Sequence, residues 1–297
     1  MRGVPGNRYL YRDCVIVAIG DSFNEAKRSG GKFVSQKYDL IGIEYDVTRK
    51  ADPEIARRIH NHVQLIEGSS VVDIGCGSGN YTIALQQMGL EMTGTDISST
   101  MVDSAKLKNH DISWIKADAC ELPFEDSAFK GAISTLVIHH FEELEGPFRE
   151  AYRVISEGRF VIFTSYPEQM RNYWLVEYFP KAMEASCKQM PPLEKVVDAL
   201  RNVGFSIVGS ETFMVQPDLE DFFLYSGKYD PCMYLDAKVR KGISTFASLA
   251  FEDEVMEGCH RLKHDIDSGK VYDVISKYNS IYGDYMFIVA EKKQPRA

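Results

Sequence analysis

One segment constrains the fold of this chain more than any other: residues 71–80, which read Val-Val-Asp-Ile-Gly-Cys-Gly-Ser-Gly-Asn. Its first residues are a short apolar, β-branched run, which is typical of a buried central strand. Glycines at alternate positions then permit a tight turn and a close approach of the backbone to a ligand. A following helix directs its free N–H groups towards the same point. The segment therefore predicts a strand, a ligand-binding loop and a helix.

The spacing of the glycines indicates which ligand this loop accepts. A dinucleotide fingerprint reads G-x-G-x-x-G, whereas Gly75, Gly77 and Gly79 follow the pattern G-x-G-x-G. Asp73 lies two positions before the first glycine, where its carboxylate would repel a pyrophosphate. A carboxylate at this point suits the cationic amino group and sulfonium of S-adenosylmethionine. We therefore expect S-adenosylmethionine as the cofactor.

Strand and helix patterns alternate along most of the chain, which predicts a doubly wound α/β fold with a parallel sheet covered on both faces. A helix is expected to start at Asp52-Pro53 and to end at Gly68. Further helices are expected at residues 81–88, 99–108, 143–155 and 193–202. Strands are expected at residues 70–74, 91–96, 112–118, 129–136, 160–164, 205–215 and 285–291.

Two aromatic-rich segments interrupt this alternation, at residues 166–192 and 217–283. Inserts after the strands of an open α/β sheet fall near its carboxyl edge, where ligands bind. We therefore divide the chain into an N-terminal arm (1–37), a cofactor-binding core (38–165, continued at 193–216), two lid inserts (166–192 and 217–283) and a last strand with a tail (284–297). Aromatic residues at helical spacing also fit plain core packing.

The segment 73–79 resembles the glycine motif of the class I S-adenosylmethionine-dependent methyltransferases. The subgroup that it resembles contains the ubiquinone- and menaquinone-biosynthesis enzymes and related small-molecule methyltransferases. The resemblance runs from Tyr38 to Thr164, and residues 199–205 and 283–285 also fit. It implies a Rossmann-like, seven-stranded, mostly parallel sheet with an antiparallel last strand. It also implies that Gly75, Gly77 and Gly79 contact the methionine part of the cofactor.

Two acidic positions extend the predicted cofactor site. Asp96 ends the second strand and is expected to accept the ribose hydroxyls, with Ile97 and Met101 beside the adenine. The position of Asp96 alone also fits NAD or a helix cap, and Met101 also fits core packing. By the resemblance, Asp118 accepts from the adenine amino group and the backbone N–H of Ala119 donates to the ring. A simple Asx-turn is the structural alternative for Asp118.

The segment Ser134–Phe141 follows the fourth strand, where the methyl group should meet its acceptor. His140, and after it His139, are the candidates to take a proton from the acceptor. A histidine here also fits a purely structural hydrogen bond. Thr135 is placed among the cofactor contacts.

The residues ahead of the loop resemble a family segment that folds over the cofactor, with Tyr38 and Arg49 as its candidate contacts. A guanidinium binds a carboxylate through two hydrogen bonds, so Arg49 suits the methionine carboxylate. A surface arginine is the alternative. His260 and His264 lie four residues apart, but without a third ligand nearby they indicate a solvated helix face, so no metal site is expected.

Composition narrows the class of partner. The formal net charge is −9, which argues against RNA or DNA as substrate because phosphates require a basic surface. Six scattered cysteines without a Cys-x-x-Cys pair indicate free thiols in the cytoplasm. The apolar run at residues 14–19 is too short for a membrane span and has no cleavage site behind it, so neither a membrane segment nor a signal peptide is expected.

The sequence therefore predicts a methyltransferase that acts on a small molecule by direct in-line transfer, with no metal. The acceptor atom (O, N or C) and the oligomeric state stay open, and a protein acceptor is an alternative. Two other classes stay open: a nicotinamide-dependent oxidoreductase on the same fold, and a non-catalytic regulator that retains the cofactor pocket.

Overall fold

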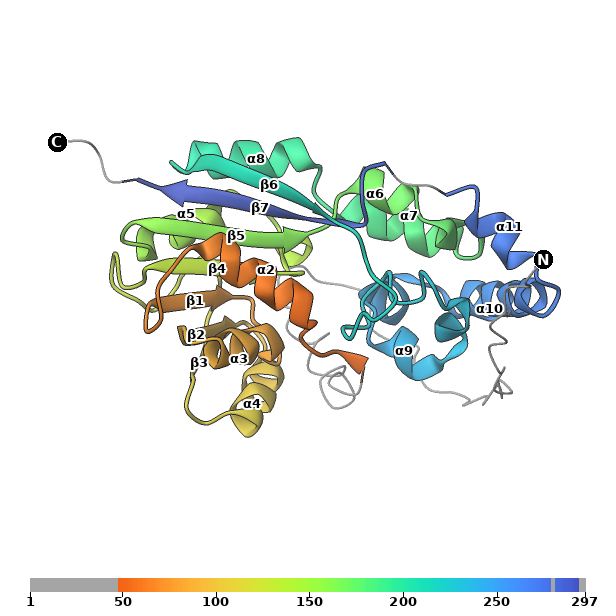
Figure 1. Cartoon of the computed structure of the whole chain (residues 1–297), viewed down its shortest axis with the longest axis horizontal. Coiled ribbons are helices and arrows are strands. Elements are labelled where there is room, and N and C mark those ends of the chain that lie inside the picture. Colours follow the sequence, from red (N-terminus) through yellow and green to blue (C-terminus); the bar gives the residue numbers. More distant parts are fainter. Residues whose placement is uncertain (1–47, 279–280, 294–297) are drawn as a thin grey trace, which may run out of the picture.

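The computed structural model describes residues 48–278 and 281–293. Within these residues, seven strands form one sheet in the order β3-β2-β1-β4-β5-β7-β6 (Figure 1). Strand β7 is antiparallel to both neighbours, and the other pairs are parallel, which confirms the expected topology. The strands are β1 (Ser70–Ile74), β2 (Glu91–Asp96), β3 (Ser113–Lys116), β4 (Gly131–Thr135), β5 (Gly158–Thr164), β6 (Ser206–Phe213) and β7 (Tyr285–Lys292).

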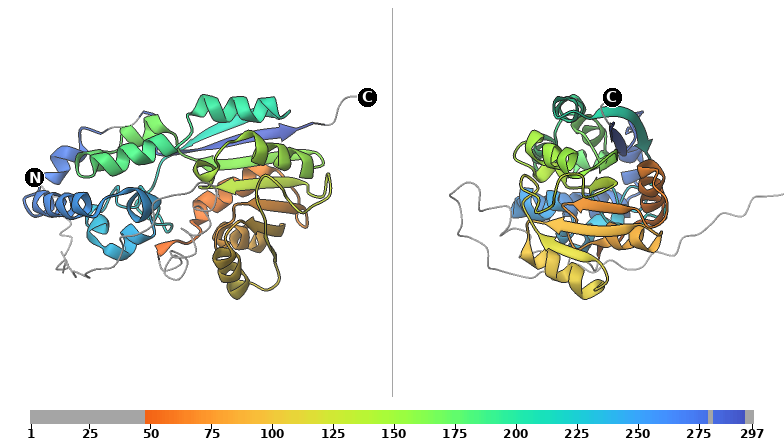
Figure 2. Two further views of the ribbon diagram at one scale, coloured as in Figure 1. Left: turned by 180° about the vertical axis from the view of Figure 1, so that it is seen from behind. Right: turned by 90° about the vertical axis from the view of Figure 1, so that its left-hand side faces the viewer.

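Helices cover both faces of the sheet because side chains alternate along each buried strand. Val71 of β1 belongs to one apolar cluster with the buried residues of helices α2, α3 and α4. Val72 belongs to the other cluster with those of α5 and α8. Figure 2 shows these two layers of helices end-on. The helices are α2 (Pro53–Val63), α3 (Asn80–Gln87), α4 (Ser99–Lys108), α5 (Glu145–Val154) and α8 (Leu193–Asn202).

Several predicted boundaries were wrong, mostly by one or two residues, and the largest error is at the end of helix α2. Helix α2 ends at Val63, well before Gly68, because Gln64 adopts a left-handed conformation with φ of 53° that stops the helix. Strand β3 is shorter than the expected 112–118. Strand β4 ends at Thr135 because the next residue, Leu136, has φ of 56° and leaves the extended conformation.

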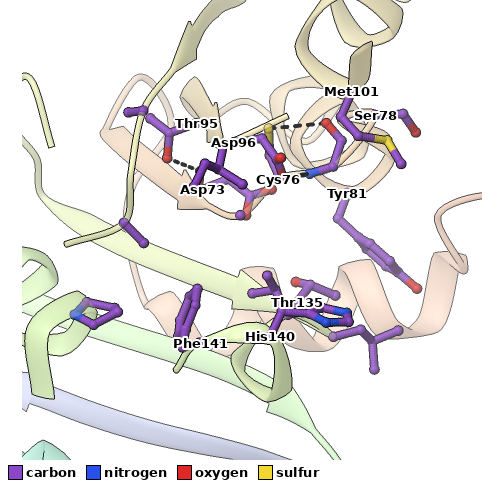
Figure 3. A pocket seen from close by; sticks show the side chains of 18 of the residues that line it. Asp73, Cys76, Ser78, Tyr81, Thr95, Asp96, Met101, Thr135, His140 and Phe141 are labelled. Atoms are coloured by element: carbon purple, nitrogen blue, oxygen red, sulfur yellow. Dashed lines mark hydrogen bonds between the residues drawn. The ribbon is translucent and has the colours of Figure 1, made fainter. Parts of the chain in front are cut away.

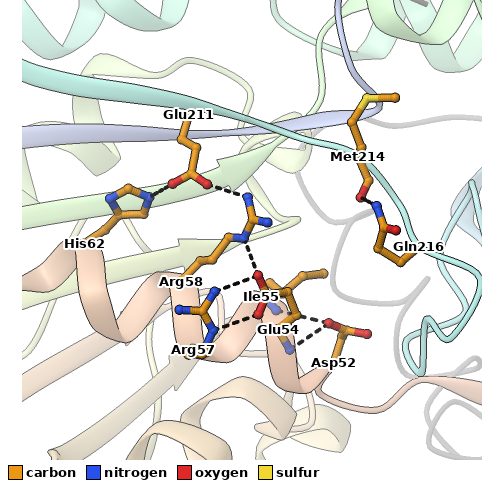
Figure 4. A network of polar contacts seen from close by, with 9 residues as sticks. All are labelled: Asp52, Glu54, Ile55, Arg57, Arg58, His62, Glu211, Met214 and Gln216. Atoms are coloured by element: carbon orange, nitrogen blue, oxygen red, sulfur yellow. Dashed lines mark hydrogen bonds and ion pairs between the residues drawn. The ribbon is translucent and has the colours of Figure 1, made fainter.

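Helix α2 is fixed to the sheet and to the second insert by charged side chains (Figure 4). Glu211 of β6 accepts a hydrogen bond from Arg58 and pairs with His62 at 2.7 Å. At the start of the helix, Oδ1 of Asp52 accepts from the backbone N–H groups of Glu54 and Ile55, so Asp52 is the N-cap. Oδ2 of Asp52 accepts from the backbone N–H of Glu220, which ties the second insert to the same cap.

The two inserts fold together into one helical layer, which we call the helical cap (described residues of 166–192 and 217–283). Trp174 of the first insert packs edge-on against Tyr234 of the second, and Phe179 packs against Phe246. The hydroxyl groups of Tyr173 and Tyr234 are hydrogen-bonded at 2.6 Å. The helices are α6 (Pro167–Arg171), α7 (Pro180–Gln189), α9 (Ala237–Lys241), α10 (Glu252–Asp267) and α11 (Val271–Ile275), with short turns η2 (Trp174–Glu177), η3 (Pro231–Leu235) and η4 (Thr245–Leu249).

The helical cap lies beyond the carboxyl ends of the parallel strands (Figure 1). Because these ends are where an open α/β sheet binds its ligands, the cap stands opposite the expected site. Most of its aromatic side chains are buried against one another, so they stabilise the cap itself.

Glycine at the start of β5 is required for this sheet. Gly158 has φ of 139°, and a Cβ there would lie 2.1 Å from the carbonyl oxygen of Lys130. We expect Gly158→Ala to lower the free energy of unfolding by about 2 kcal/mol or more. Gly209→Ala in β6 is the control, since its Cβ would meet only Val289 at 3.9 Å. Urea unfolding of both variants tests this, and equal midpoints would contradict it.

Candidate active site

The loop after β1 is shaped by glycines that no other residue can replace without strain. Gly75 has φ of 77°, and a Cβ there would lie 2.5 Å from the side chain of Val137. Gly79 has φ of 79°, and its Cβ would lie 2.3 Å from the ring of Trp114. The backbone N–H groups of Gly75 and Cys76 donate to the carbonyl of Thr95 at 2.8 and 2.9 Å, which holds the loop against β2.

A cavity of about 380 Å³ opens beside this loop, at the carboxyl ends of β1, β2 and β4. Its size is within the range of roughly 300–1,000 Å³ that small-molecule sites occupy. Figure 3 shows Asp73 and Asp96 on one side of it, and Thr135 and His140 on the other. Most of the predicted site residues line it: Arg49, Asp73, Gly75, Gly77, Asp96, Ile97, Met101, Asp118, Ala119, Thr135 and His140.

Among the described residues, two of the predicted ones do not line this cavity. Gly79 packs behind the loop against Trp114. His139 borders a second, smaller cavity. Tyr38 and the N-terminal arm lie outside the described residues.

Asp73 is the most unusual ionisable group of the cavity. Its side chain is buried, and Oδ2 accepts a hydrogen bond from the hydroxyl of Thr82 at 2.7 Å. Oδ1 is buried without a hydrogen-bond partner among the described residues. Burial, together with the nearby charge of Asp96, raises the pKa of Asp73 to about 7, against the opposing effect of the Thr82 bond. A cationic group placed in the cavity would supply the missing partner.

Asp96 joins the loops that follow β1 and β2. Its Oδ2 accepts from the backbone N–H of Gly77 and its Oδ1 from that of Ser98, both at 2.9 Å. Burial raises the pKa of Asp96, and these backbone bonds oppose the shift. Each carboxylate oxygen can accept a further hydrogen bond, so the group can also receive hydroxyl groups of a ligand. The N-cap of α4 is Ser98, whose hydroxyl accepts from the N–H of Met101.

Asp118 forms the Asx-turn that was its structural alternative: Oδ1 accepts from the backbone N–H of Cys120 at 2.8 Å. It is also exposed at the mouth of the cavity, beside Ala119. Met101 likewise is buried in the core and lines the cavity. Asp118 and Met101 thus each have a structural contact and still face the cavity, where the predicted ligand contact can form.

The end of β4 carries strained and polar groups towards the cavity. Leu136 adopts a left-handed conformation, which is uncommon outside glycine and often found at functional sites. The hydroxyl of the preceding Thr135 is buried without a partner among the described residues. The rings of His139 and His140 stand 3.9 Å apart, and Nδ1 of His140 lies 3.4 Å from the side-chain nitrogen of Gln189.

Arg49 is held by an acidic residue of the helical cap. Its Nε and Nη2 contact Asp221 at 2.5 and 3.2 Å, and Nη1 donates to the carbonyl of Gly242 at 3.3 Å. The hydroxyl of Tyr81 donates to the same carboxylate at 3.1 Å. Sequence reasoning missed Tyr81 and Asp221, although both line the cavity. Asp221 lies 172 residues from Arg49, and no local pattern distinguishes it from the other acids of the insert.

The candidate metal ligands of α10, His260 and His264, are exposed. In the described part of the chain, no three histidine, cysteine or acidic side chains form a group that could hold a metal ion. Over the same residues, the structure has no helix that is both long and apolar enough to span a membrane.

Comparison with known proteins identifies the family. A family model described as a methyltransferase domain matches residues 72–163. The crystal structure of a candidate methyltransferase from an antibiotic biosynthesis pathway of Anabaena variabilis is 33% identical, with a TM-score of 0.74. The match covers 82% of this chain and 98% of that one.

Curated relatives match over shorter regions. A tRNA (carboxymethyluridine(34)-5-O)-methyltransferase of Arabidopsis thaliana is 30% identical over 48% of this chain and 34% of its own length. A demethylmenaquinone methyltransferase of Thermotoga maritima is 27% identical over 48% of this chain and 66% of its own. The matches span between about a third and two thirds of the length of these two relatives.

The fold, the glycine loop and these matches define one class of protein. The chain belongs to the class I S-adenosylmethionine-dependent methyltransferases. Its loop spacing and family membership set aside the nicotinamide-dependent alternative.

The raised pKa of Asp73 gives the ligand-free protein a specific pH dependence. A carboxyl whose pKa is higher in the folded state stabilises the fold at low pH, and this stabilisation is lost as pH rises towards about 7. Asparagine does not ionise, so we expect the Asp73→Asn variant to lack this fall in stability with rising pH. The stability of the variant relative to the parent should rise between pH 5 and pH 7 and level off above pH 8.

Urea unfolding at four pH values across this interval measures the difference. Asp103→Asn, at an exposed position of α4, is the matched control and should show no such trend. A flat difference for Asp73→Asn would mean that the carboxyl is ionised in the folded protein throughout.

Proposed function

We propose that this protein transfers the methyl group of S-adenosylmethionine to a small molecule. One observation carries the proposal: a buried carboxylate, that of Asp73, has one oxygen without a partner among the described residues and lines a ligand-sized cavity. Leaving such a group unpaired is costly, so the site favours a ligand that brings a positive charge to this point. The cofactor of the family carries two, an ammonium and a sulfonium.

The other residues of the cavity fit the rest of the cofactor. Asp96 is proposed to accept the ribose hydroxyls, and Asp118 with the N–H of Ala119 to bind the adenine. Ile97 and Met101 supply apolar surface beside it. Arg49 is proposed to hold the methionine carboxylate while it is paired with Asp221. The bound sulfonium supplies an electrophilic methyl group, so the protein mainly has to align the acceptor and exclude water.

A small molecule is the acceptor class that the charge and the shape of the site favour. The chain has a net charge of −9, which opposes binding of nucleic acid. The helical cap, which we propose to be the lid of this enzyme, stands over the carboxyl ends of the strands and restricts access. Cys76, Cys120, Cys187 and Cys259 are free thiols, which supports a reducing, cytoplasmic location.

The two histidines after β4 are proposed to have different positions relative to the acceptor. His140 lines both the cofactor cavity and the second cavity, whereas His139 lines only the second. His140 is therefore the residue placed between donor and acceptor, where it can donate a hydrogen bond to the acceptor or take its proton.

Titration calorimetry tests the cofactor assignment. We expect S-adenosylmethionine and S-adenosylhomocysteine to bind and NAD not to bind. Asp96→Ala should weaken both adenosyl ligands by about tenfold or more, because each hydrogen bond to a charged group contributes roughly 1.5–3 kcal/mol. Glu91→Gln, at the opposite end of the same strand, is the control. Binding of NAD alone would overturn the proposal, and tight S-adenosylhomocysteine binding without turnover on any acceptor would favour a regulator.

A second experiment separates His140 from His139. With an acceptor identified from a panel by transfer of labelled methyl groups, His140→Ala should lower kcat by about 10²-fold if the imidazole takes the proton of the acceptor. The affinity for S-adenosylhomocysteine should stay within about twofold, since this change removes no proposed cofactor contact. His139→Ala is the paired comparison and should be affected less. An equal loss in both variants would contradict the assigned positions.

A further inference from the structure

One segment of the second insert, residues 220–222, reaches the cofactor cavity and is held there by its backbone. The N–H of Glu220 donates to Oδ2 of Asp52, the N-cap of α2, at 3.1 Å. The N–H of Phe222 donates to the carbonyl of Thr48 at 3.0 Å. The residue between these two bonds is thus fixed from both sides, and its side chain lines the cavity.

That residue is Asp221, which is buried with 1% of its side chain exposed. Its carboxylate accepts hydrogen bonds from three side-chain groups: Nε and Nη2 of Arg49 and the hydroxyl of Tyr81. Because Nε and Nη2 bind different carboxylate oxygens, the contact fixes the plane of the guanidinium as well as its position. A buried carboxylate with this set of donors is well suited to hold an arginine in one orientation.

Tyr81 connects the same carboxylate to the other side of the cavity. It belongs to α3, the helix that follows the glycine loop, and its ring is buried. Its hydroxyl donates to Asp221 at 3.1 Å and accepts from the backbone N–H of Asp52 at 3.4 Å. Burial and the charge of Asp221 raise the pKa of Tyr81 well above its usual value, so the phenol stays protonated and remains a donor.

Two opposite effects of Asp221 on an anionic ligand of Arg49 can be distinguished. An arginine side chain loses conformational entropy when it binds a ligand, and its bonds to Asp221 and to the carbonyl of Gly242 remove that freedom beforehand. The negative charge of Asp221 also weakens the attraction between Arg49 and a carboxylate. The three bonds that fix the guanidinium favour the first effect, and the sign of the net effect can be measured.

We propose that Asp221 and Tyr81 are positioning residues for the cofactor, which act by holding Arg49 in the orientation that binds the methionine carboxylate. This inference rests on the proposed function, in which Arg49 binds that carboxylate. Since Asp221 belongs to the second insert, binding of the amino-acid part of the cofactor and docking of residues 220–222 stabilise one another.

The adenosine part of the cofactor takes no part in this coupling. Asp96 and Asp118 are proposed to bind it, and their printed bonds within the described residues go to backbone N–H groups of their own loops and of the glycine loop. Removal of the Arg49 network should therefore affect the two parts of the cofactor unequally.

Two ligands separate these contributions on the full chain. S-adenosylhomocysteine has the amino-acid part and methylthioadenosine lacks it, so the ratio of their Kd values isolates the effect on that part. In titration calorimetry we expect Asp221→Asn to weaken S-adenosylhomocysteine by about tenfold and Tyr81→Phe by about threefold, with methylthioadenosine changed by less than about twofold. Tyr81→Phe keeps the buried ring, so it decides the outcome on its own where Asp221→Asn does not fold.

Asp284→Asn is the matched control. Asp284 is also buried, with 2% exposed, and it pairs with Lys228 of the same insert, but it lines neither cavity. This variant should leave the ratio of the two Kd values unchanged.

Hydrogen exchange of the backbone gives a second readout. The N–H groups of Glu220 and Phe222 should exchange more slowly with S-adenosylhomocysteine bound than with methylthioadenosine bound, because only the former is coupled to the docking of this segment. Tyr81→Phe should reduce the difference.

Failure of the proposed function and failure of this inference give different results. A parent protein that does not bind S-adenosylhomocysteine contradicts the proposed function. If the parent binds it, an unchanged Kd ratio in Tyr81→Phe, or exchange of residues 220–222 that does not depend on the ligand, overturns the positioning role alone. Tighter binding of S-adenosylhomocysteine by Asp221→Asn also overturns it, since Asp221 would then act by repulsion. An equal change of the ratio in Asp284→Asn does the same, because it would indicate a general loosening of the cap.

Discussion

The carboxylate of Asp96 is the point on which the site depends. It accepts one backbone N–H from the glycine loop, at Gly77, and one from the start of the next turn, at Ser98. These charge-assisted bonds hold the ends of β1 and β2 at a fixed separation. The strand order places β4 on the other side of β1, so the glycine loop, Asp96 and the end of β4 converge at the carboxyl edge of the sheet. The cavity exists because three parallel strands end there together.

The buried carboxyl group of Asp73 lowers the stability of the folded, ligand-free protein. Asp73 is buried with one oxygen unpaired among the described residues, and its pKa is raised to about 7. A well-packed apolar residue at this position would give the ligand-free protein a higher free energy of unfolding. The cost is explained when the ligand is a cation, because the ligand then supplies the pairing that the protein lacks. Function and stability make opposite demands at this residue, as they often do at binding sites.

The elements that depend on local interactions could be predicted from the sequence. The periodicity of β1, the alternating glycines and the cap at Asp52 depend on residues a few positions apart, and the structure has them where they were expected. Most of the predicted cofactor residues line one cavity for a related reason, since most of them lie at the end of a parallel strand or in the segment that follows it. Asp221 could not be found in this way. It comes from an insert whose helices are placed by aromatic packing within the cap, and its partner Arg49 lies 172 residues away in the chain.

The ion pair of Arg49 and Asp221 lies where the two cavities meet. Arg49 borders both cavities, and Asp221 borders only the one beside the glycine loop. Because the pair is nearly neutral as a unit, it adds little net charge to either cavity. The hydroxyl of Tyr81, from the helix after the glycine loop, donates to the same carboxylate. The pair is thus bonded to the helix after the glycine loop through Tyr81 and to the helical cap through the backbone of Gly242, so the position of the cap and the shape of the cavity depend on one another.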